Sequence, residues 1–122
     1  MPTSELATRK CAPCSGKTQP LDPERVRELL AKVPDWKLGA DGKRISRSWR
    51  VLDFAAGLDF FCRIADVAEA EDHHPDLHLT DYRDVTVELS THAAGGLTDN
   101  DFIMAAKIDG LEQPALKSEK KG

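Results

Sequence analysis

Histidines are concentrated in one segment of the chain, residues 69–101. All four histidines of the 122-residue sequence lie in it, and they are His73, His74, His78 and His92. Imidazole is the side chain that titrates nearest to neutral pH, and it is also the commonest protein ligand for metal ions. Acid–base catalysis and metal binding are therefore the two kinds of chemistry that this segment favours.

The spacing of Glu69 and His73 fits acid–base chemistry. Residues four apart lie on one face of a helix, so the Glu69 carboxylate can reach the His73 imidazole. That contact, together with a position at a helix C-terminus, would favour the protonated imidazole. A histidine held in this way can act as a general acid near neutral pH. An ordinary helix-capping histidine has the same spacing, so the spacing leaves both interpretations open.

The remaining histidines differ in what their surroundings indicate. His92 comes before the glycine-containing loop 93–96 and a helix start at Thr98, a setting in which it could face a site. His78 alternates with leucines, which is typical of an exposed strand residue. A zinc site built from the histidines is the metal alternative. Adjacent histidines project differently and the sequence has no HExxH pair, so we expect no metal ion.

A single CxxC pair, Cys11 and Cys14, is a candidate for redox chemistry or for half of a zinc site. A zinc ribbon needs a second pair, which the sequence lacks, and Pro13 favours an irregular loop. We therefore expect residues 1–20 to form a flexible N-terminal arm. Cys62 lies in an apolar helical pattern and is expected in the core.

Composition places the chain among ordinary globular domains. Hydrophobic residues make up 40% and charged residues 31%, and the net charge is −4. Acidic and basic residues are interleaved, so no basic face for direct nucleic-acid binding is expected. No apolar run reaches the roughly 20 residues that span a bilayer, and the N-terminus lacks an apolar signal core. We expect no membrane association and a cytoplasmic location.

Periodicity predicts the elements that must position the histidines. Alternating apolar and polar residues predict strands around 35–38, 45–51, 77–79 and 85–89. Helical spacing predicts helices at about 23–32 and 54–72, and a third between Thr98 and Gly110. In the second helix one apolar face is expected, widened by Ile64 and Cys62 and marked by Phe54, Leu58, Phe61, Ala65 and Ala68.

The order α–ββ–α–ββ–α predicts an α+β fold. We expect a two-layer sandwich in which helices pack on one face of a four-stranded antiparallel sheet. Residues 21–110 are the expected domain, between the arm at 1–20 and a flexible C-terminal tail at 111–122.

One spacing pattern in the histidine segment resembles the signature of the pterin-4a-carbinolamine dehydratase family. The pattern consists of Glu69, His73-His74-Pro75, Tyr82, His92 and Asp101. Supporting fragments are Asp35-Trp36, Leu89-Ser90-Thr91-His92 and Gly96-Leu97-Thr98. The resemblance covers roughly residues 21–110, and the arm with its CxxC pair resembles bacterial members more than animal ones.

This resemblance implies a fold and an activity. The family fold has two β-hairpins, each followed by a helix, and an additional N-terminal helix. The implied reaction converts 4a-hydroxytetrahydropterin, also called the 4a-carbinolamine, into quinonoid dihydropterin and water. It recycles the pterin that aromatic amino-acid hydroxylases use, and it needs no metal or organic cofactor. A homodimer or homotetramer is implied, with an aromatic amino-acid hydroxylase as a candidate partner.

The resemblance also implies residue roles. His73 and His92 would form the acid–base pair, with either residue as acid or base, and His74 would bind and orient the pterin. Glu69 would orient His73, and Asp101 would order the pocket around His92. Trp36 is either an aromatic wall for the pterin or ordinary core. Pro75 and Thr91 are counted among the supporting residues, and Asn100 stands where animal members carry arginine.

A non-catalytic alternative keeps the same fold. The chain could be a pterin-binding, regulatory or dimerisation module without turnover, because fold alone does not fix function. A pure interaction module does not need all three of His73, His74 and His92, so the complete set favours the enzyme. Nothing in the sequence supports the transcription-factor partnership of the animal proteins.

Overall fold

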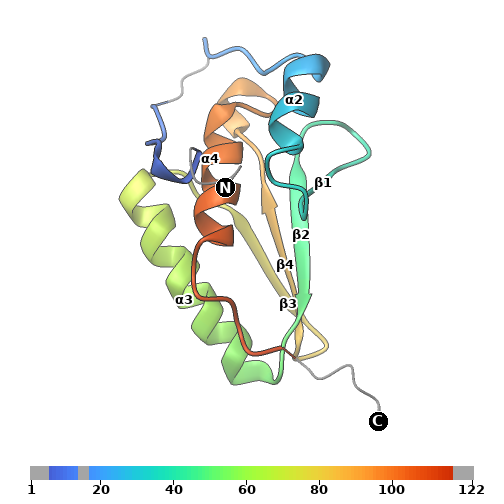
Figure 1. Cartoon of the computed structure of the whole chain (residues 1–122), viewed down its shortest axis with the longest axis vertical. Helices are drawn as coiled ribbons and strands as arrows, with labels where there is room; N and C mark the ends of the chain where they lie inside the picture. The colour runs from blue at the N-terminus through green and yellow to red at the C-terminus, as the bar shows by residue number, and fades with distance from the viewer. Residues whose placement is uncertain (1–5, 14–16, 117–122) are drawn as a thin grey trace.

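The computed structural model describes residues 6–13 and 17–116. A four-stranded sheet forms one layer, and the helices α3 and α4 cover one of its faces (Figure 1). The described elements are α2 (Pro23–Leu30), β1 (Lys37–Leu38), β2 (Ile45–Arg50), α3 (Phe54–Glu71), β3 (Asp76–Thr80), β4 (Asp84–Leu89), a 3₁₀ turn (His92–Ala94) and α4 (Asp99–Asp109). The predicted α+β class, strand number and element order are confirmed.

The sheet is antiparallel throughout, with strand order β1-β2-β4-β3. Period-2 alternation sends one row of side chains into the core, because successive residues of a strand point to opposite faces. Ile45 and Trp49 of β2 and Val85 and Val87 of β4 are buried in this way. On the opposite face, exposed hydroxyls pair across the strands, as Ser48 does with Thr86 at 3.0 Å.

Helix α3 ends where its sequence predicts that it must. Asp53 caps its N-terminus by accepting the Ala56 N–H. At the other end Asp72 adopts the left-handed conformation with φ 54°, and Pro75 follows three residues later. The residue before a proline is disfavoured in the α region, so the chain leaves the helix as an extended segment. His73 and His74 lie on this exit segment.

The apolar face of α3 is rotated from the expected one. Ile64 and Ala68 are buried as predicted, together with Gly57 and Phe60, whereas Phe54 and Leu58 are exposed. Cys62 is exposed as well, and the expectation of a core cysteine is wrong. The contact at Gly57 accounts for the rotation, because a Cβ there would lie 3.1 Å from the Leu79 side chain. The close approach of helix and sheet at this glycine selects the face that is buried.

Helix α4 is the most deeply buried helix in the described part of the chain. Eight of its 11 residues are buried, including Asp101 and Asn100 in its first turn. It contacts both α3 and β4. Its N-terminus therefore lies next to the end of α3, and two segments that are far apart in the sequence meet there.

The segments outside residues 21–110 pack on the domain more closely than the sequence predicted. Leu6 is 3% exposed and belongs to the hydrophobic core. The Lys107 ammonium donates a hydrogen bond of 2.6 Å to the Ala7 carbonyl. At the other end, Gln113 accepts from the Trp49 ring N–H at 2.9 Å. Residues 6–13 and 111–116 thus contact the domain, and the flexibility expected of the arm and tail stays a prediction.

The expected CxxC pair and the expected absence of a membrane span can be compared with the structure only over the described residues. Cys14, the second half of the CxxC pair, lies outside the described residues, as do residues 1–5 and 117–122. Across residues 6–13 and 17–116, no helix has the length and apolar character to cross a membrane.

Candidate active site

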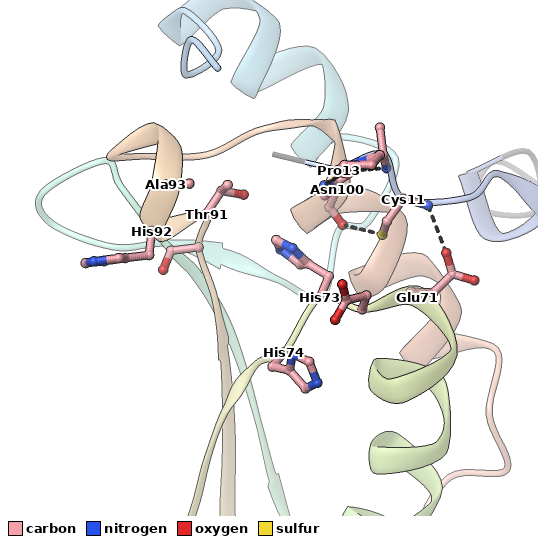
Figure 2. Close-up of a pocket in the computed structure, with 12 residues that line it drawn as sticks. Cys11, Pro13, Glu71, His73, His74, Thr91, His92, Ala93 and Asn100 are labelled. Carbon is pink, nitrogen blue, oxygen red and sulfur yellow. Dashed lines mark hydrogen bonds between the residues drawn. The ribbon is translucent and has the colours of Figure 1, made fainter. Parts of the chain in front are cut away.

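A cavity of about 500 Å³ opens where α3 ends, β4 ends and α4 begins (Figure 2). A volume of this size is typical of small-molecule sites. Its walls are formed by Cys11, Ala12, Pro13, Glu71, Asp72, His73, His74, Ser90, Thr91, His92, Ala93 and Asn100. Three of the four histidines of the sequence therefore meet at one cavity, although 18 residues separate His74 from His92 in the chain.

His73 is held by a buried carboxylate. Its ring nitrogen Nε2 lies 2.8 Å from Oδ1 of Asp101, a residue of the first turn of α4. The His73 side chain is 11% exposed and that of Asp101 is fully buried. A short contact in such a location fixes the orientation of the imidazole, because water cannot compete for either partner.

The second oxygen of Asp101 is also occupied. Oδ2 accepts the Thr91 hydroxyl at 2.8 Å and the Thr98 backbone N–H at 3.0 Å. An ionised carboxylate only accepts hydrogen bonds, so Nε2 of His73 must be the donor in its contact with Asp101. The other ring nitrogen, Nδ1, is left for the cavity. The arrangement resembles a buried aspartate that holds a catalytic histidine in one tautomer and one orientation.

Glu69 binds a different histidine from the one that the sequence predicted. Its Oε2 lies 2.8 Å from Nε2 of His74, not of His73, and both side chains of the pair are exposed. The i,i+4 rule fails here because α3 ends at Glu71 and the left-handed Asp72 turns His73 toward α4. Glu69 therefore supports His74 at the rim, and it does not line the cavity.

His92 differs from His73 in its surroundings. It begins the 3₁₀ turn after β4 and is exposed, and its ring extends away from His73 in Figure 2. Asp101 was expected to order the pocket around His92, and its side-chain contacts go to His73, Thr98 and Thr91, the residue before His92. The fold thus provides one anchored imidazole and one exposed imidazole at the same cavity.

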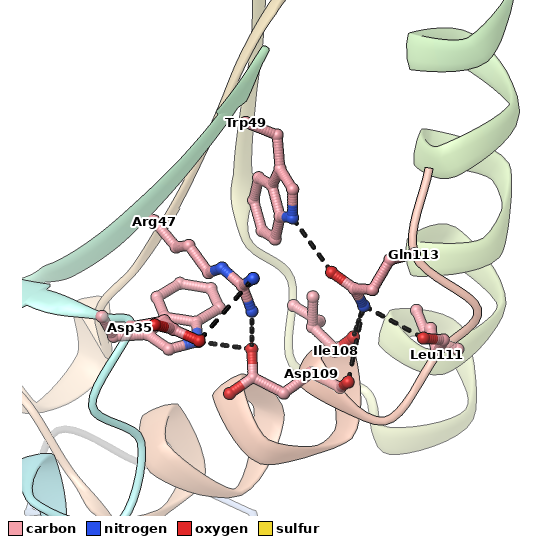
Figure 3. Close-up of polar contacts among 8 residues, drawn as sticks. Asp35, Arg47, Trp49, Ile108, Asp109, Leu111 and Gln113 are labelled. Atoms are coloured by element: carbon pink, nitrogen blue, oxygen red, sulfur yellow. Dashed lines mark hydrogen bonds and ion pairs between the residues drawn. The ribbon is translucent and has the colours of Figure 1, made fainter. Parts of the chain in front are cut away.

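Trp36 does not form a wall of the cavity. It is 2% exposed, and its ring N–H donates to Oδ1 of Asp109 at 2.9 Å. Asp109 also accepts from the Arg47 guanidinium at 2.6 Å, and Arg47 lies over the Trp49 ring (Figure 3). Of the two interpretations of Trp36, the core one is therefore correct. Its position is set by a partly buried polar cluster on the side of α4 that faces β2.

Two further sequence candidates lie away from the cavity walls. Pro75 is half-buried on the exit segment of α3 and acts there by ending the helix. His78 lies on the outer face of β3, half-exposed, with Nε2 3.3 Å from Glu88, as expected for a strand residue without a site role. Among the described residues, no group of three or more histidine, cysteine, aspartate or glutamate side chains is placed to hold a metal ion.

Eight of the 12 cavity residues were not among the predicted site residues. They are Cys11, Ala12 and Pro13 of the N-terminal segment, Glu71 and Asp72 at the end of α3, Ser90 and Ala93 on either side of Thr91–His92, and Asn100 beside Asp101. The Cys11 backbone N–H donates to Glu71 at 2.8 Å. This hydrogen bond, together with Lys107 and Lys10, outweighs the effect of burial and holds the pKa of Glu71 below its usual value. Partners about 60 and 90 residues apart leave no local pattern that could have revealed them.

Comparison with known proteins agrees with the resemblance. The sequence profile of the family described as pterin 4 alpha carbinolamine dehydratase matches residues 19–111. The chain belongs to this family. The match covers the sheet, α2, α3 and α4, and it begins after the N-terminal segment that contacts the cavity.

Individual relatives extend the comparison. A protein of Arabidopsis thaliana named pterin-4-alpha-carbinolamine dehydratase 2, mitochondrial, is 49% identical over 97% of this chain, which spans 65% of that protein's length. A Halorhodospira halophila protein named as a candidate dehydratase of the same kind is 42% identical over 87% of this chain and 96% of its own. The crystal structure of a transcriptional coactivator/pterin dehydratase from Brucella melitensis superposes with TM-score 0.70 at 32% identity, covering 75% of this chain and 97% of that one.

Proposed function

We propose that the chain dehydrates 4a-hydroxytetrahydropterin to quinonoid dihydropterin and water by histidine acid–base catalysis. The observation that carries the proposal is the His73–Asp101 pair at the wall of a cavity of pterin size. Membership of the dehydratase family supports the reaction class.

The reaction needs two proton transfers and no electron transfer. The C4a–O bond breaks as the leaving hydroxyl takes a proton and departs as water, and a ring nitrogen of the pterin loses a proton as the quinonoid system forms. The protein donates one proton to the leaving hydroxyl and accepts one from the pterin ring nitrogen. Its net protonation is therefore unchanged after one turnover, and proton exchange with solvent restores each side chain to its starting state. Side chains that carry protons near neutral pH are sufficient for both transfers.

His73 is suited to protonate the leaving hydroxyl. Asp101 binds Nε2–H, which leaves Nδ1 to carry the proton toward the substrate. The carboxylate stabilises the imidazolium before the transfer and keeps the ring aimed at the cavity after it. His92, which is exposed, then accepts the ring-nitrogen proton and releases it to water. His74, oriented by Glu69 at the rim, binds the pterin edge.

We also propose an aromatic amino-acid hydroxylase as a partner, a homo-oligomeric state and a cytoplasmic location. The substrate is the product of aromatic amino-acid hydroxylases, so such an enzyme would supply this one. Exposed Leu52, Phe54, Leu58 and Leu116 provide apolar surface for a homo-oligomer, whose subunit number light scattering would measure. A cytoplasmic location stays a prediction, and the plant relative is named as mitochondrial.

No metal or organic cofactor is needed in this proposal, because proton transfer by imidazole suffices. We expect exhaustive dialysis against a chelator to leave kcat unchanged. A loss of activity that zinc restores would contradict the cofactor-free mechanism, and elemental analysis of the purified protein before dialysis would identify the metal.

The test of the proposed function is the dehydration of chemically generated 4a-hydroxytetrahydropterin, followed by ultraviolet absorbance. Wild-type protein should accelerate it, and His73→Ala should lose about 100-fold or more in kcat, the usual contribution of one acid–base group. His78→Ala is the matched control, because His78 is an imidazole on the same protein that lies outside the cavity.

The same assay separates the enzyme from the non-catalytic alternative. A binding or regulatory module would leave the dehydration rate at its value without protein, while still binding a dihydropterin in a fluorescence titration. Equal rates with and without wild-type protein would overturn the proposed function.

A further inference from the structure

The N-terminal segment 6–13 forms one side of the candidate active site. Cys11, Ala12 and Pro13 line the cavity together with His73 and His92. In Figure 2, Cys11 and Pro13 lie on the side of the cavity opposite to His92 and Ala93, with His73 between them. A substrate bound at His73 would therefore have the segment as its neighbour.

The segment is attached at three points to the elements that carry the site, and two of these points lie at the cavity, at Ala12 and Cys11. The Ala12 N–H donates to Oδ1 of Asn100 at 2.9 Å, and Asn100 Nδ2 donates back to the Ala12 carbonyl at 2.7 Å. The Cys11 N–H binds Glu71 at 2.8 Å. Two reciprocal amide contacts and one charge-assisted hydrogen bond define the backbone position of residues 11–12.

A third attachment lies outside the cavity. Lys107 of α4 donates to the Ala7 carbonyl at 2.6 Å and lies 3.8 Å from the Glu71 carboxylate. Lys107 thereby links the segment to the Glu71 carboxylate, which accepts the hydrogen bond from the Cys11 N–H. Leu6 anchors the start of the segment in the core. Lys107 does not line the cavity itself and acts on it through its contacts with Ala7 and Glu71, which makes it a positioning residue.

We propose that residues 11–13 form part of the substrate-binding wall, so that the seating of the segment sets the KM for the pterin and the tolerance for the size of its ring substituent. This inference rests on the proposed function. Residues 11–13 lie outside residues 19–111, the part of the chain that the family profile matches. The alignment with the plant relative spans 97% of this chain and therefore includes residues 11–13.

The experiment compares Lys107→Met with wild type on two carbinolamines, one with a methyl and one with a dihydroxypropyl substituent on the ring. Lys107→Met keeps the alkyl stem and removes the donor to Ala7. We expect KM to rise about five-fold, the ratio that about 1 kcal/mol of binding free energy makes, with kcat falling by less. The ratio of kcat/KM between the two substrates should also change. Lys107→Arg, which retains a cation, should restore most of the wild-type KM.

Asn100→Ala is the second variant and removes both hydrogen bonds to Ala12. It should change the substrate ratio in the same direction, and the double variant should be non-additive because both act through one segment. Arg44→Ala is the control, since it breaks an exposed ion pair with Glu88 of the sheet that lies away from both the cavity and the N-terminal segment.

Hydrogen exchange gives a readout that does not depend on turnover. The Cys11 and Ala12 amides should exchange more slowly when a dihydropterin fills the cavity and faster in Lys107→Met. Suppose that wild type is active but that both variants keep the wild-type KM, substrate ratio and amide exchange. That result would contradict the proposal that residues 11–13 form part of the substrate-binding wall. A wild type without dehydratase activity would instead overturn the proposed function.

Discussion

Asp101 is the residue that organises the site. Its two carboxylate oxygens accept hydrogen bonds from His73, Thr91 and Thr98, three residues from three separate segments. The sequence pattern predicted that His73, Asp101 and Thr91 belong to one site. It did not predict which residue binds which, because pairing depends on where α3 ends and on the direction that Asp72 gives the chain. Glu69 was accordingly assigned to the wrong histidine.

At the residue scale, Thr91→Val tests whether the support of Asp101 matters. The variant removes one donor to the buried carboxylate, which should lower stability by about 1–3 kcal/mol and kcat by about ten-fold. Thermal unfolding and the dehydration assay measure the two effects. Thr86→Val is the matched control, because its hydroxyl pairs with Ser48 on the exposed face of the sheet. A Thr91→Val enzyme with wild-type kcat would show that the orientation of Asp101 does not limit catalysis.

At the scale of elements, the site depends on the junction between the C-terminus of α3 and the N-terminus of α4. Proline and capping signals predicted both ends, since Pro75 after α3 and Thr98 before α4 act locally. The segment 6–13 was not predictable, because its backbone groups bind side chains 60 to 90 residues away. An irregular segment with no period of its own gives no sign of where it will dock.

The docking of this segment should be sensitive to acid. The pKa of Glu71 is lower in the folded protein than in the unfolded chain, chiefly because of the hydrogen bond from Cys11. Its ionised form therefore stabilises the fold above its unfolded pKa of about 4.3, and this contribution is lost as the pH falls through the lower folded value. Glu71→Gln should be less stable than wild type at pH 7, and the difference should shrink below about pH 4.

Thermal unfolding of wild type and Glu71→Gln across this pH range measures the effect. Glu69→Gln serves as the control, because Glu69 is exposed and touches only His74 at the rim. A stability difference for Glu71→Gln that stays constant from neutral to acid pH would contradict the assigned role of the carboxylate.

At the scale of the whole molecule, the α+β sandwich was predictable because strand alternation and helix periodicity are properties of the whole chain. Which face of α3 is buried was not, since the contact of Gly57 with Leu79 decides it. The polar cluster of Arg47, Asp109 and Trp36 inside the sandwich was also not predicted (Figure 3). Burial raises the pKa of Asp109, against the opposing effect of its bonds to Trp36 and Arg47.

Removing Asp109 should destabilise the whole fold. Asp109→Ala leaves the Trp36 ring N–H and the Arg47 guanidinium without their acceptor, at a cost of about 2–3 kcal/mol in unfolding free energy. Asp109→Asn keeps an oxygen acceptor and should cost less. Asp35→Ala is the control, because Asp35 is largely exposed and lies 3.7 Å from the same arginine. Denaturant unfolding measures all three, and equal losses for Ala and Asn would contradict the acceptor role.

The central claim is that an imidazole held by a buried carboxylate performs the dehydration. A double-mutant cycle of His73→Ala and Asp101→Asn, read out as kcat, tests it most directly. Asp101→Asn alone should lower kcat substantially, because an amide no longer stabilises the imidazolium. In the His73→Ala background the same change should have little further effect, since the residue then has no imidazole to hold. Fully additive losses would mean that Asp101 acts independently of His73 and would contradict the account.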